Sequence, residues 1–160
     1  MTSAWLPPEQ YIETIARATS YACLYFTDTA GHPFQMRSRN KREIWQWPGG
    51  NLESGETPWD GARRECLEET GYDFRGPQKL IGVHFITAGT AWPANHIGFI
   101  FDGGHLSDDQ LSKIKLTDEH TEWQVKPLDG WRREMSPVNF ARLDAINTAR
   151  RTGTVAYLER

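Results

Sequence analysis

The chain has 160 residues, of which 38% are hydrophobic and 24% are charged, so its size and composition suit one soluble domain with one hydrophobic core. The net charge of −3 and the sequence pI near 5.9 argue against a protein built mainly to hold nucleic acid, which usually has a basic surface. The sequence has neither an apolar run approaching the roughly 20 residues of a membrane-spanning helix nor a secretory signal. We therefore expect a cytoplasmic protein without membrane contact.

The N-terminal third of the chain predicts a peripheral segment followed by strands. Residues 9–18 have apolar residues at roughly helical spacing after two prolines, and we treat residues 1–18 as peripheral to a single domain spanning 1–160. Residues 20–28 and 34–39 are expected to be strands joined by a turn at 29–33. A short aromatic strand at 43–48 ends at a proline, and Gly49 and Gly50 then let the backbone bend and approach a ligand closely.

The remainder of the chain alternates helices and strands. Thr57 and Pro58 predict a helix start and Gly71 a left-handed cap, so we expect a helix over 58–70 with Ala62, Cys66 and Trp59 facing inward. Strands are expected at 79–86, 95–102 and 122–128, and a last helix at 137–151. Its predicted apolar stripe consists of Phe140, Leu143, Ile146 and Ala149. This order predicts an α/β domain with a mixed sheet sandwiched between helices.

The helix at 58–70 carries an unusual set of carboxylates. Glu65, Glu68 and Glu69 are spaced to share one helix face, where like charges destabilise a helix by roughly 0.2–0.5 kcal/mol per pair. One explanation is a solvated helix face, since Glu is a good helix former. The other is a site for a divalent cation such as Mg²⁺, which prefers oxygen ligands and would cancel the repulsion. Arg64 is placed to reach back to Glu56 and tie the preceding loop to the helix.

The spacing of these residues resembles a known motif. From Gly50 to Tyr72 the chain reads Gly50, five residues, Glu56, seven residues, Arg64-Glu65, Cys66, then Glu68-Glu69 and Gly71. This is similar to the Nudix box of the Nudix hydrolases, with every fixed position filled, although aliphatic residues are commoner where Cys66 and Tyr72 stand. The resemblance implies the Nudix fold and a metal-dependent pyrophosphohydrolase. Such an enzyme cleaves a nucleoside diphosphate linked to another moiety, as in a nucleoside triphosphate, a nucleotide sugar or ADP-ribose, by attack of water on phosphorus.

The resemblance also implies roles for particular residues. Glu65, Glu69 and Glu68 and the backbone carbonyl of Gly49 would hold Mg²⁺, with Mn²⁺ as a substitute. Gly50, Glu56, Arg64 and Gly71 would have structural roles in the box. The general base is left open between the box glutamates Glu65 and Glu68 and the later Glu119 and Glu122, each of the later pair having a solvated surface charge as its alternative explanation.

Substrate recognition lies outside the box. Arg37 and Arg39 precede the glycine loop and are candidates to hold phosphate, because guanidinium groups bind it bidentately; the alternative is a basic surface hairpin. Trp45 is a candidate for stacking on a base, although aromatic residues on strands usually belong to the core. We expect a small nucleotide or nucleoside diphosphate derivative as partner, and the resemblance is compatible with a homodimer.

Three other functions remain to be weighed. A catalytically silent Nudix module that binds nucleotides would typically have lost box glutamates, and all of them are present here. Isomerisation of isopentenyl diphosphate needs a catalytic cysteine in the pocket, which Cys66 on the packing face and Cys23 on an early strand do not suit. A hydrolase acting on an RNA 5′ end is disfavoured by the acidic balance, except through a short contact at residues 37–42.

Overall fold

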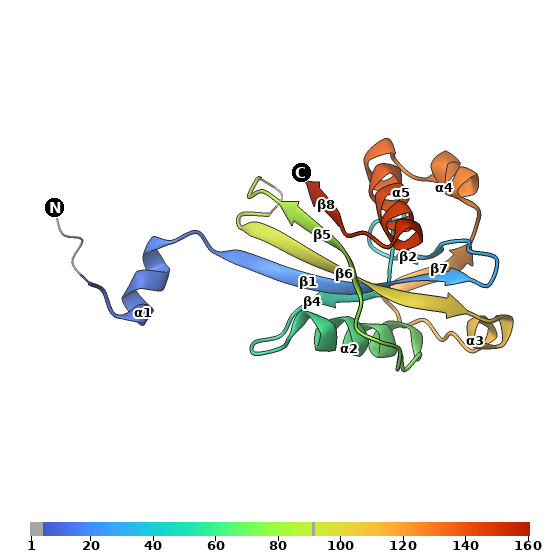
Figure 1. The fold of residues 1–160 in the computed structure, drawn as a ribbon, viewed down its shortest axis with the longest axis horizontal. Coiled ribbons are helices and arrows are strands. Elements are labelled where there is room, and N and C mark those ends of the chain that lie inside the picture. The colour runs from blue at the N-terminus through green and yellow to red at the C-terminus, as the bar shows by residue number, and fades with distance from the viewer. Residues whose placement is uncertain (1–4, 91) are drawn as a thin grey trace.

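The computed structural model describes residues 5–90 and 92–160, which form two sheets with helices packed on them (Figure 1). The helices are α1 (Pro8–Tyr11), the 3-10 helix η1 (Ile12–Thr14), α2 (Pro58–Thr70), α3 (Asp108–Ser112), α4 (Leu128–Glu134) and α5 (Pro137–Thr152). The strands are β1 (Ala18–Asp28), β2 (Phe34–Ser38), β3 (Trp45–Gln46), β4 (Gly49–Asn51), β5 (Leu80–Ile86), β6 (Asn95–Leu106), β7 (His120–Val125) and β8 (Ala156–Glu159). One sheet has the order β4-β1-β6-β5-β8 and the other β3-β2-β7.

The larger sheet is mixed and lies between helices. β1 runs parallel to β6 and antiparallel to β4, while β5 runs antiparallel to β6 and parallel to β8. Because successive strand residues point to opposite faces, Leu24 and Phe26 join the core cluster under α2, whereas Cys23 and Tyr25 join the cluster under α4 and α5. Figure 1 shows α2 on one side of this sheet and α5 on the other. The predicted fold class, a mixed sheet sandwiched between helices, is therefore confirmed.

The two long helices lie within one residue of their predicted bounds. The Thr57 hydroxyl accepts a hydrogen bond from the Asp60 N–H at 3.2 Å, and Gly71 ends α2 with φ of 70°. α5 begins after Ser136 and ends at Gly153, also with φ of 70°. All four residues of its predicted apolar stripe are buried. Ala62 and Cys66 of α2 are likewise buried, and Trp59 packs against the same cluster.

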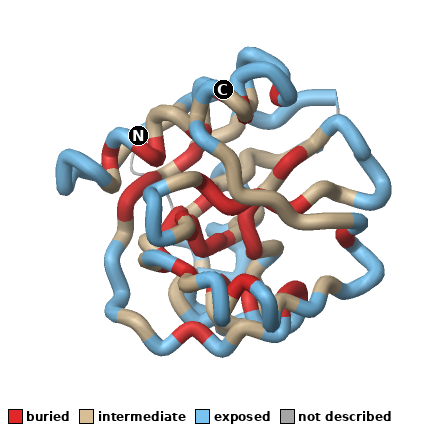
Figure 2. The backbone as a smooth tube through the Cα atoms, turned by 90° about the vertical axis from the view of Figure 1, so that its right-hand side faces the viewer, coloured by how far each residue is buried: buried red, intermediate tan, exposed pale blue. Residues whose placement is uncertain are grey.

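The N-terminal segment differs from the expectation. The helix predicted over 9–18 is limited to α1 and η1, which bury no residue, and Ala18 already pairs with Asn95 in the ladder between β1 and β6. In Figure 1 this segment projects away from the sheets, and its apolar side chains remain exposed. α3, α4, β4 and β8 had not been predicted. In Figure 2 buried positions lie mostly in the interior of the molecule, and exposed positions lie mostly at its periphery. Among the described residues, no helix is both long and apolar enough to cross a bilayer.

Candidate active site

Two glycines bring β4, an edge strand of the larger sheet, close to both β1 and α2. A Cβ on Gly49 would lie 2.3 Å from the carbonyl oxygen of Ala22, so only glycine allows this close approach to β1. A Cβ on Gly50 would lie 2.5 Å from Oε1 of Glu65. The strand therefore passes directly beside a carboxylate of the box helix, and the glycines predicted to let the backbone approach a ligand occupy that position.

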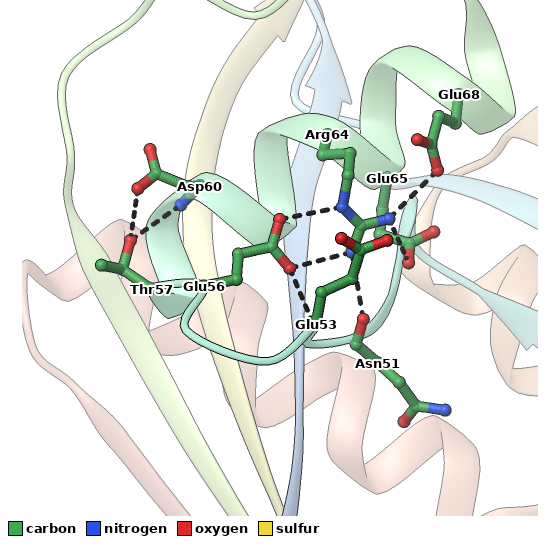
Figure 3. A network of polar contacts seen from close by, with 8 residues as sticks. All are labelled: Asn51, Glu53, Glu56, Thr57, Asp60, Arg64, Glu65 and Glu68. Atoms are coloured by element: carbon green, nitrogen blue, oxygen red, sulfur yellow. Dashed lines mark hydrogen bonds and ion pairs between the residues drawn. The ribbon is translucent and has the colours of Figure 1, made fainter.

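Arg64 organises the carboxylates at the start of the site (Figure 3). Its Nε and Nη2 donate to the two oxygens of Glu56 at 2.8 and 3.0 Å, a bidentate pair that ties the loop to α2. Nη1 donates to Glu65 at 2.9 Å and to Glu68 at 3.1 Å, and Nη2 also donates to the carbonyl of Asn51 at 3.1 Å. One guanidinium thus holds the loop, β4 and the helix in a fixed relation, which is the geometry expected of the structural pair Glu56 and Arg64.

Glu69 is the buried carboxylate of the site. Its side chain is only 4% exposed, and its Oε2 accepts a hydrogen bond from the N–H of Gly49 at 2.8 Å. Burial, together with the neighbouring charges of Glu65, Glu119 and Glu68, raises the pKa of Glu69 to about 8 against the lowering effect of the Gly49 N–H. This carboxyl group is therefore held in a place where its negative charge is costly unless a cation accompanies it.

Glu65 shares this environment. Burial raises its pKa, the adjacent Arg64 lowers it, and the charges of Glu68 and Glu119 raise it. Within the described residues, no group of three or more acidic, histidine or cysteine side chains is already arranged so that it could hold a metal ion. The side chains present nevertheless suit a divalent cation, which prefers oxygen ligands. The carboxylates of Glu65 and Glu69 lie beside the glycines of β4, and the repulsion between neighbouring carboxylates contributes to their raised pKa values.

A histidine and a glutamine from outside the box adjoin Glu69. Nε2 of His120 lies 2.8 Å from Nε2 of Gln46 and 3.7 Å from Oε1 of Glu69. Burial lowers the pKa of His120, against the raising effect of Glu119, so the ring is neutral near pH 7 and its Nε2 accepts from the Gln46 amide. Nδ1 is buried without a partner among the described residues. From the sequence, His120 is a possible base between Glu119 and Glu122, with an incidental loop histidine as its alternative explanation, whereas nothing in the sequence points to Gln46.

The two later base candidates lie in different surroundings. Glu119 stands in the turn before β7 and is close enough to raise the pKa of Glu65 and Glu69. Glu122 lies on β7, where it forms an ion pair with Nε of Arg37 at 3.0 Å and accepts a hydrogen bond from Gln124 at 2.7 Å. The charge of Glu119 therefore acts on the carboxylates of α2, whereas Glu122 is engaged with Arg37.

The substrate-binding candidates lie on the smaller sheet. Arg37 pairs with Trp45 across β2 and β3, with its guanidinium carbon 4.5 Å from the centre of the Trp45 ring. Strand alternation places both on the sheet face opposite to Gln46, which reaches His120. Arg39 is half exposed and its Nε donates to the carbonyl of Asp118. Arg37 and Arg39 are thus both engaged within the protein, and Trp45 is buried.

Sequence comparison relates the chain to a known family and to known proteins. The family model of the NUDIX domain matches residues 16–140. An RNA pyrophosphohydrolase of Bartonella bacilliformis is 39% identical over 69 residues, which cover 34% of this chain and 37% of that protein. An RNA pyrophosphohydrolase of Rhodopseudomonas palustris is 28% identical over 100 residues, covering 53% of this chain and 59% of that protein. The matched regions thus span between 37% and 59% of the length of these two relatives.

Solved structures share the fold. A MutT protein of Methanosarcina mazei superposes with a TM-score of 0.68 at 24% identity, covering 86% of this chain and 96% of that one. A UDP-X diphosphatase superposes with a TM-score of 0.69 at 17% identity, covering 96% of this chain and 75% of that one. Since the family model matches most of the chain and these structures share its architecture, the chain belongs to the Nudix family.

Proposed function

We propose that the protein is a cytoplasmic, metal-dependent pyrophosphohydrolase. It would cleave a nucleoside diphosphate linked to another moiety, such as a nucleoside triphosphate, a nucleotide sugar or an ADP-ribose-like compound. The observation that carries the proposal is the buried Glu69, held against the N–H of Gly49, with Glu65 beside Gly50. A fold gains nothing from burying a carboxylate among other carboxylates, whereas a cation site requires it.

The residues that would hold the cation come from α2 and from the first residue of β4. Glu65, Glu69 and Glu68 supply carboxylate oxygens, and the carbonyl of Gly49 supplies a neutral one. Mg²⁺ is the ion that fits such oxygen ligands and a shared pyrophosphate, and Mn²⁺ would substitute for it. When bound, the ion would neutralise phosphate oxygens and lower the pKa of a coordinated water.

The other site residues would position groups and move a proton. Arg64 and Glu56 fix the loop so that Gly49 and Gly50 stay beside the helix. Glu119 is our assignment for the general base, because its charge acts on Glu65 and Glu69 and Glu122 is held by Arg37. Glu65 is the alternative base within the box.

A second candidate substrate is the triphosphorylated 5′ end of an RNA. It is favoured by the names of two curated relatives, both RNA pyrophosphohydrolases. The acidic balance of the chain limits an RNA footprint to a short contact. The complete set of box glutamates disfavours a catalytically silent binding module.

The test is product release from a substrate panel. It includes nucleoside triphosphates, nucleotide sugars, ADP-ribose, dinucleoside polyphosphates and a 5′-triphosphorylated oligoribonucleotide, each with Mg²⁺, with Mn²⁺ and with chelator. We expect cleavage of one class that chelator abolishes and that the substitution Glu65→Gln strongly reduces. Cleavage that persists in chelator, or that Glu65→Gln leaves unchanged, would contradict the proposed site.

A further inference from the structure

A pocket separate from the carboxylate site lies where the chain leaves α2. It has a volume of about 560 Å³, within the roughly 300–1,000 Å³ that is typical of ligand pockets. Its walls come from residues 72–77 and Lys79 after α2, from residues 102–105 near the end of β6, and from Gln110 of α3. Neither the carboxylates assigned to the cation site nor the base candidates line it, so the proposed hydrolysis does not account for this pocket.

A β-bulge with two glycines forms one wall of the pocket. In the ladder between β1 and β6 the register shifts at Gly103, which has no partner on β1. A Cβ on Gly103 would lie 2.3 Å from Cε1 of Phe26, whereas a Cβ on Gly104 would meet no atom within 4 Å. Gly104 has φ of 76°, a conformation that favours glycine. Bulges are common at sheet edges and beside functional sites, and this one lies between two inner strands of the larger sheet.

The charged groups at the pocket leave one cation in excess. Asp102 accepts hydrogen bonds from Nε of Arg150 at 2.7 Å and from Nζ of Lys79 at 3.3 Å, so two cations share one carboxylate. Arg75 forms an ion pair with Asp73 at the rim. The side chain of Arg150 is 13% exposed and that of Lys79 is 51% exposed, so the ammonium group of Lys79 is the one that a ligand can reach. A negatively charged group therefore complements the pocket.

The opposite wall is apolar and carries one free hydroxyl donor. It consists of Tyr72, Phe74 and Pro77. The Tyr72 hydroxyl accepts a hydrogen bond from Nε2 of Gln110 at 2.9 Å, and its own O–H finds no acceptor among the described residues. Burial raises the pKa of Tyr72, so this hydroxyl keeps its proton near pH 7 and can donate to a ligand. An aromatic wall with a donor, facing an accessible cation, suits a planar ring joined to an anionic group.

We propose that the pocket between residues 72–79 and the bulge at Gly103 is a second, non-catalytic binding site for a nucleoside monophosphate. The base would lie on the wall formed by Tyr72, Phe74 and Pro77, and the phosphate would bind Lys79, since lysine and arginine are the usual phosphate ligands. The proposed function would supply this ligand, because cleavage of a nucleoside diphosphate derivative releases a nucleoside monophosphate. Binding itself does not depend on that activity.

Glycine amides allow binding to be located by nuclear magnetic resonance. In ¹⁵N–¹H spectra of the metal-free protein, Gly103 and Gly104 report on this pocket, and Gly49 and Gly50 report on the carboxylate site. The probes are AMP, GMP, CMP and UMP, titrated separately. We expect the shifts of Gly103 and Gly104 to saturate with a Kd below about 1 mM for at least one of them. The corresponding nucleoside and ribose 5-phosphate each lack one half of that ligand and should bind at least about tenfold more weakly.

Substitution of one lysine tests the phosphate contact. Lys79→Gln should raise the Kd at this pocket by roughly fivefold, because it removes the accessible cation. Lys113→Gln is the matched control, since Lys113 also forms an exposed ion pair with an aspartate, Asp109, but does not line the pocket, and it should leave the Kd unchanged. Circular dichroism shows whether each variant is folded. If Lys79→Gln is not, Arg75→Gln, at a side chain that is 76% exposed, should weaken binding instead.

Three results would overturn the proposal. The first is that no monophosphate produces saturable shifts of Gly103 and Gly104, including the case in which only Gly49 and Gly50 shift. The second is equal affinity for ribose 5-phosphate, which would show a phosphate site without recognition of the base. The third is an unchanged Kd in the folded Lys79→Gln protein.

The outcome is independent of the hydrolysis panel. Monophosphate binding at Gly103 and Gly104 in a protein that cleaves nothing would support the second site and contradict the proposed activity. Cleavage without such binding would do the reverse.

Discussion

At the scale of a single residue, the buried carboxyl group of Glu69 should make the stability of the protein depend on pH. Its pKa is raised from 4.5 to about 8 mainly by burial, so between these pH values the folded protein keeps a proton that the unfolded chain has released. Stability falls with pH wherever the folded state binds more protons. The metal-free protein should therefore lose stability as pH rises from about 4.5 to about 8. A cation must displace the same proton, so its affinity should rise over this range.

The substitution Glu69→Gln tests this linkage. Glutamine keeps an oxygen for the Gly49 N–H but does not titrate, so the metal-free variant should gain stability relative to the wild type as pH rises from 5 to 8. Hydrolysis should fall by more than about 100-fold, since even the loss of residues that only support metal ligands costs 10–100-fold. Thermal unfolding across pH, in chelator, measures the first effect. A difference in stability that does not change with pH would show that Glu69 does not titrate as described.

Glu119 and Glu122 differ in their surroundings, and this predicts different consequences of substitution. Glu119→Gln should lower kcat by about 10²–10⁴-fold, the usual contribution of a general base. Glu122→Gln removes an ion pair with Arg37 that is partly exposed and should change kcat only a few-fold. Steady-state kinetics of the two variants measured side by side provide the comparison. Two small losses would return the base role to Glu65.

At the scale of elements, β4 and α2 form a unit in which two adjacent glycines do different things. Gly49 is packed against the backbone of β1, which cannot move without disturbing the sheet, whereas Gly50 faces the carboxylate end of the Glu65 side chain. The sequence alone predicted that both glycines were needed. Only the structure shows that one serves the sheet and the other leaves room for a carboxylate.

Alanine substitutions should separate these two roles. Gly49→Ala should destabilise the protein by several kcal/mol, because a Cβ would overlap the carbonyl of Ala22. Gly50→Ala should cost less stability but displace Glu65 and strongly reduce activity. Urea unfolding and hydrolysis measured on both variants give the two readouts. The interpretation is wrong if Gly50→Ala retains wild-type turnover.

The helices with clear capping signals were predictable, and the elements without local signals were not. Thr57, Pro58 and Gly71 determine both ends of α2, and Ser136 and Gly153 do the same for α5. β8 has four residues and exists because it pairs with β5, a long-range contact that no local pattern encodes. The helix expected over 9–18 fails because β1 extends back to Ala18 and leaves its apolar residues without a surface to cover.

The candidate site likewise contains some residues that the sequence predicted and others that it did not. The box residues are spaced along one loop and helix, so the sequence predicted that Glu56, Arg64, Glu65 and Glu69 act together. His120 and Gln46 come from distant segments and reach the site through the pairing of β2 with β3 and β7. Their side chains carry no local pattern that relates them to the box. Long-range topology, which a single sequence does not display, determined these neighbours.

At the scale of the whole molecule, the N-terminal segment stands apart from the domain. Trp5 is 81% exposed, α1 and η1 bury no residue, and the family match begins at residue 16. The segment thus contributes little to either core cluster. We expect the core of the domain to fold without it.

Deletion of residues 1–15 tests that expectation. Because the segment buries no side chains in α1 or η1, the shortened protein should keep its unfolding temperature within a few degrees, equivalent to less than about 1 kcal/mol for a chain of this size. Its hydrolysis of the substrate found in the panel should be unchanged. A large fall in unfolding temperature would show that the segment is part of the folded unit.

The central claim is that the α2 carboxylates hold a divalent cation, and Mn²⁺ binding followed by electron paramagnetic resonance at pH 8 tests it most directly. Titration of the metal-free protein should remove the signal of free Mn²⁺. The double substitution Glu65→Gln and Glu69→Gln should abolish this binding, while Glu122→Gln, as a matched loss of charge on β7, should preserve it. If the double variant binds Mn²⁺ as well as the wild type does, the carboxylates of α2 are not the metal site.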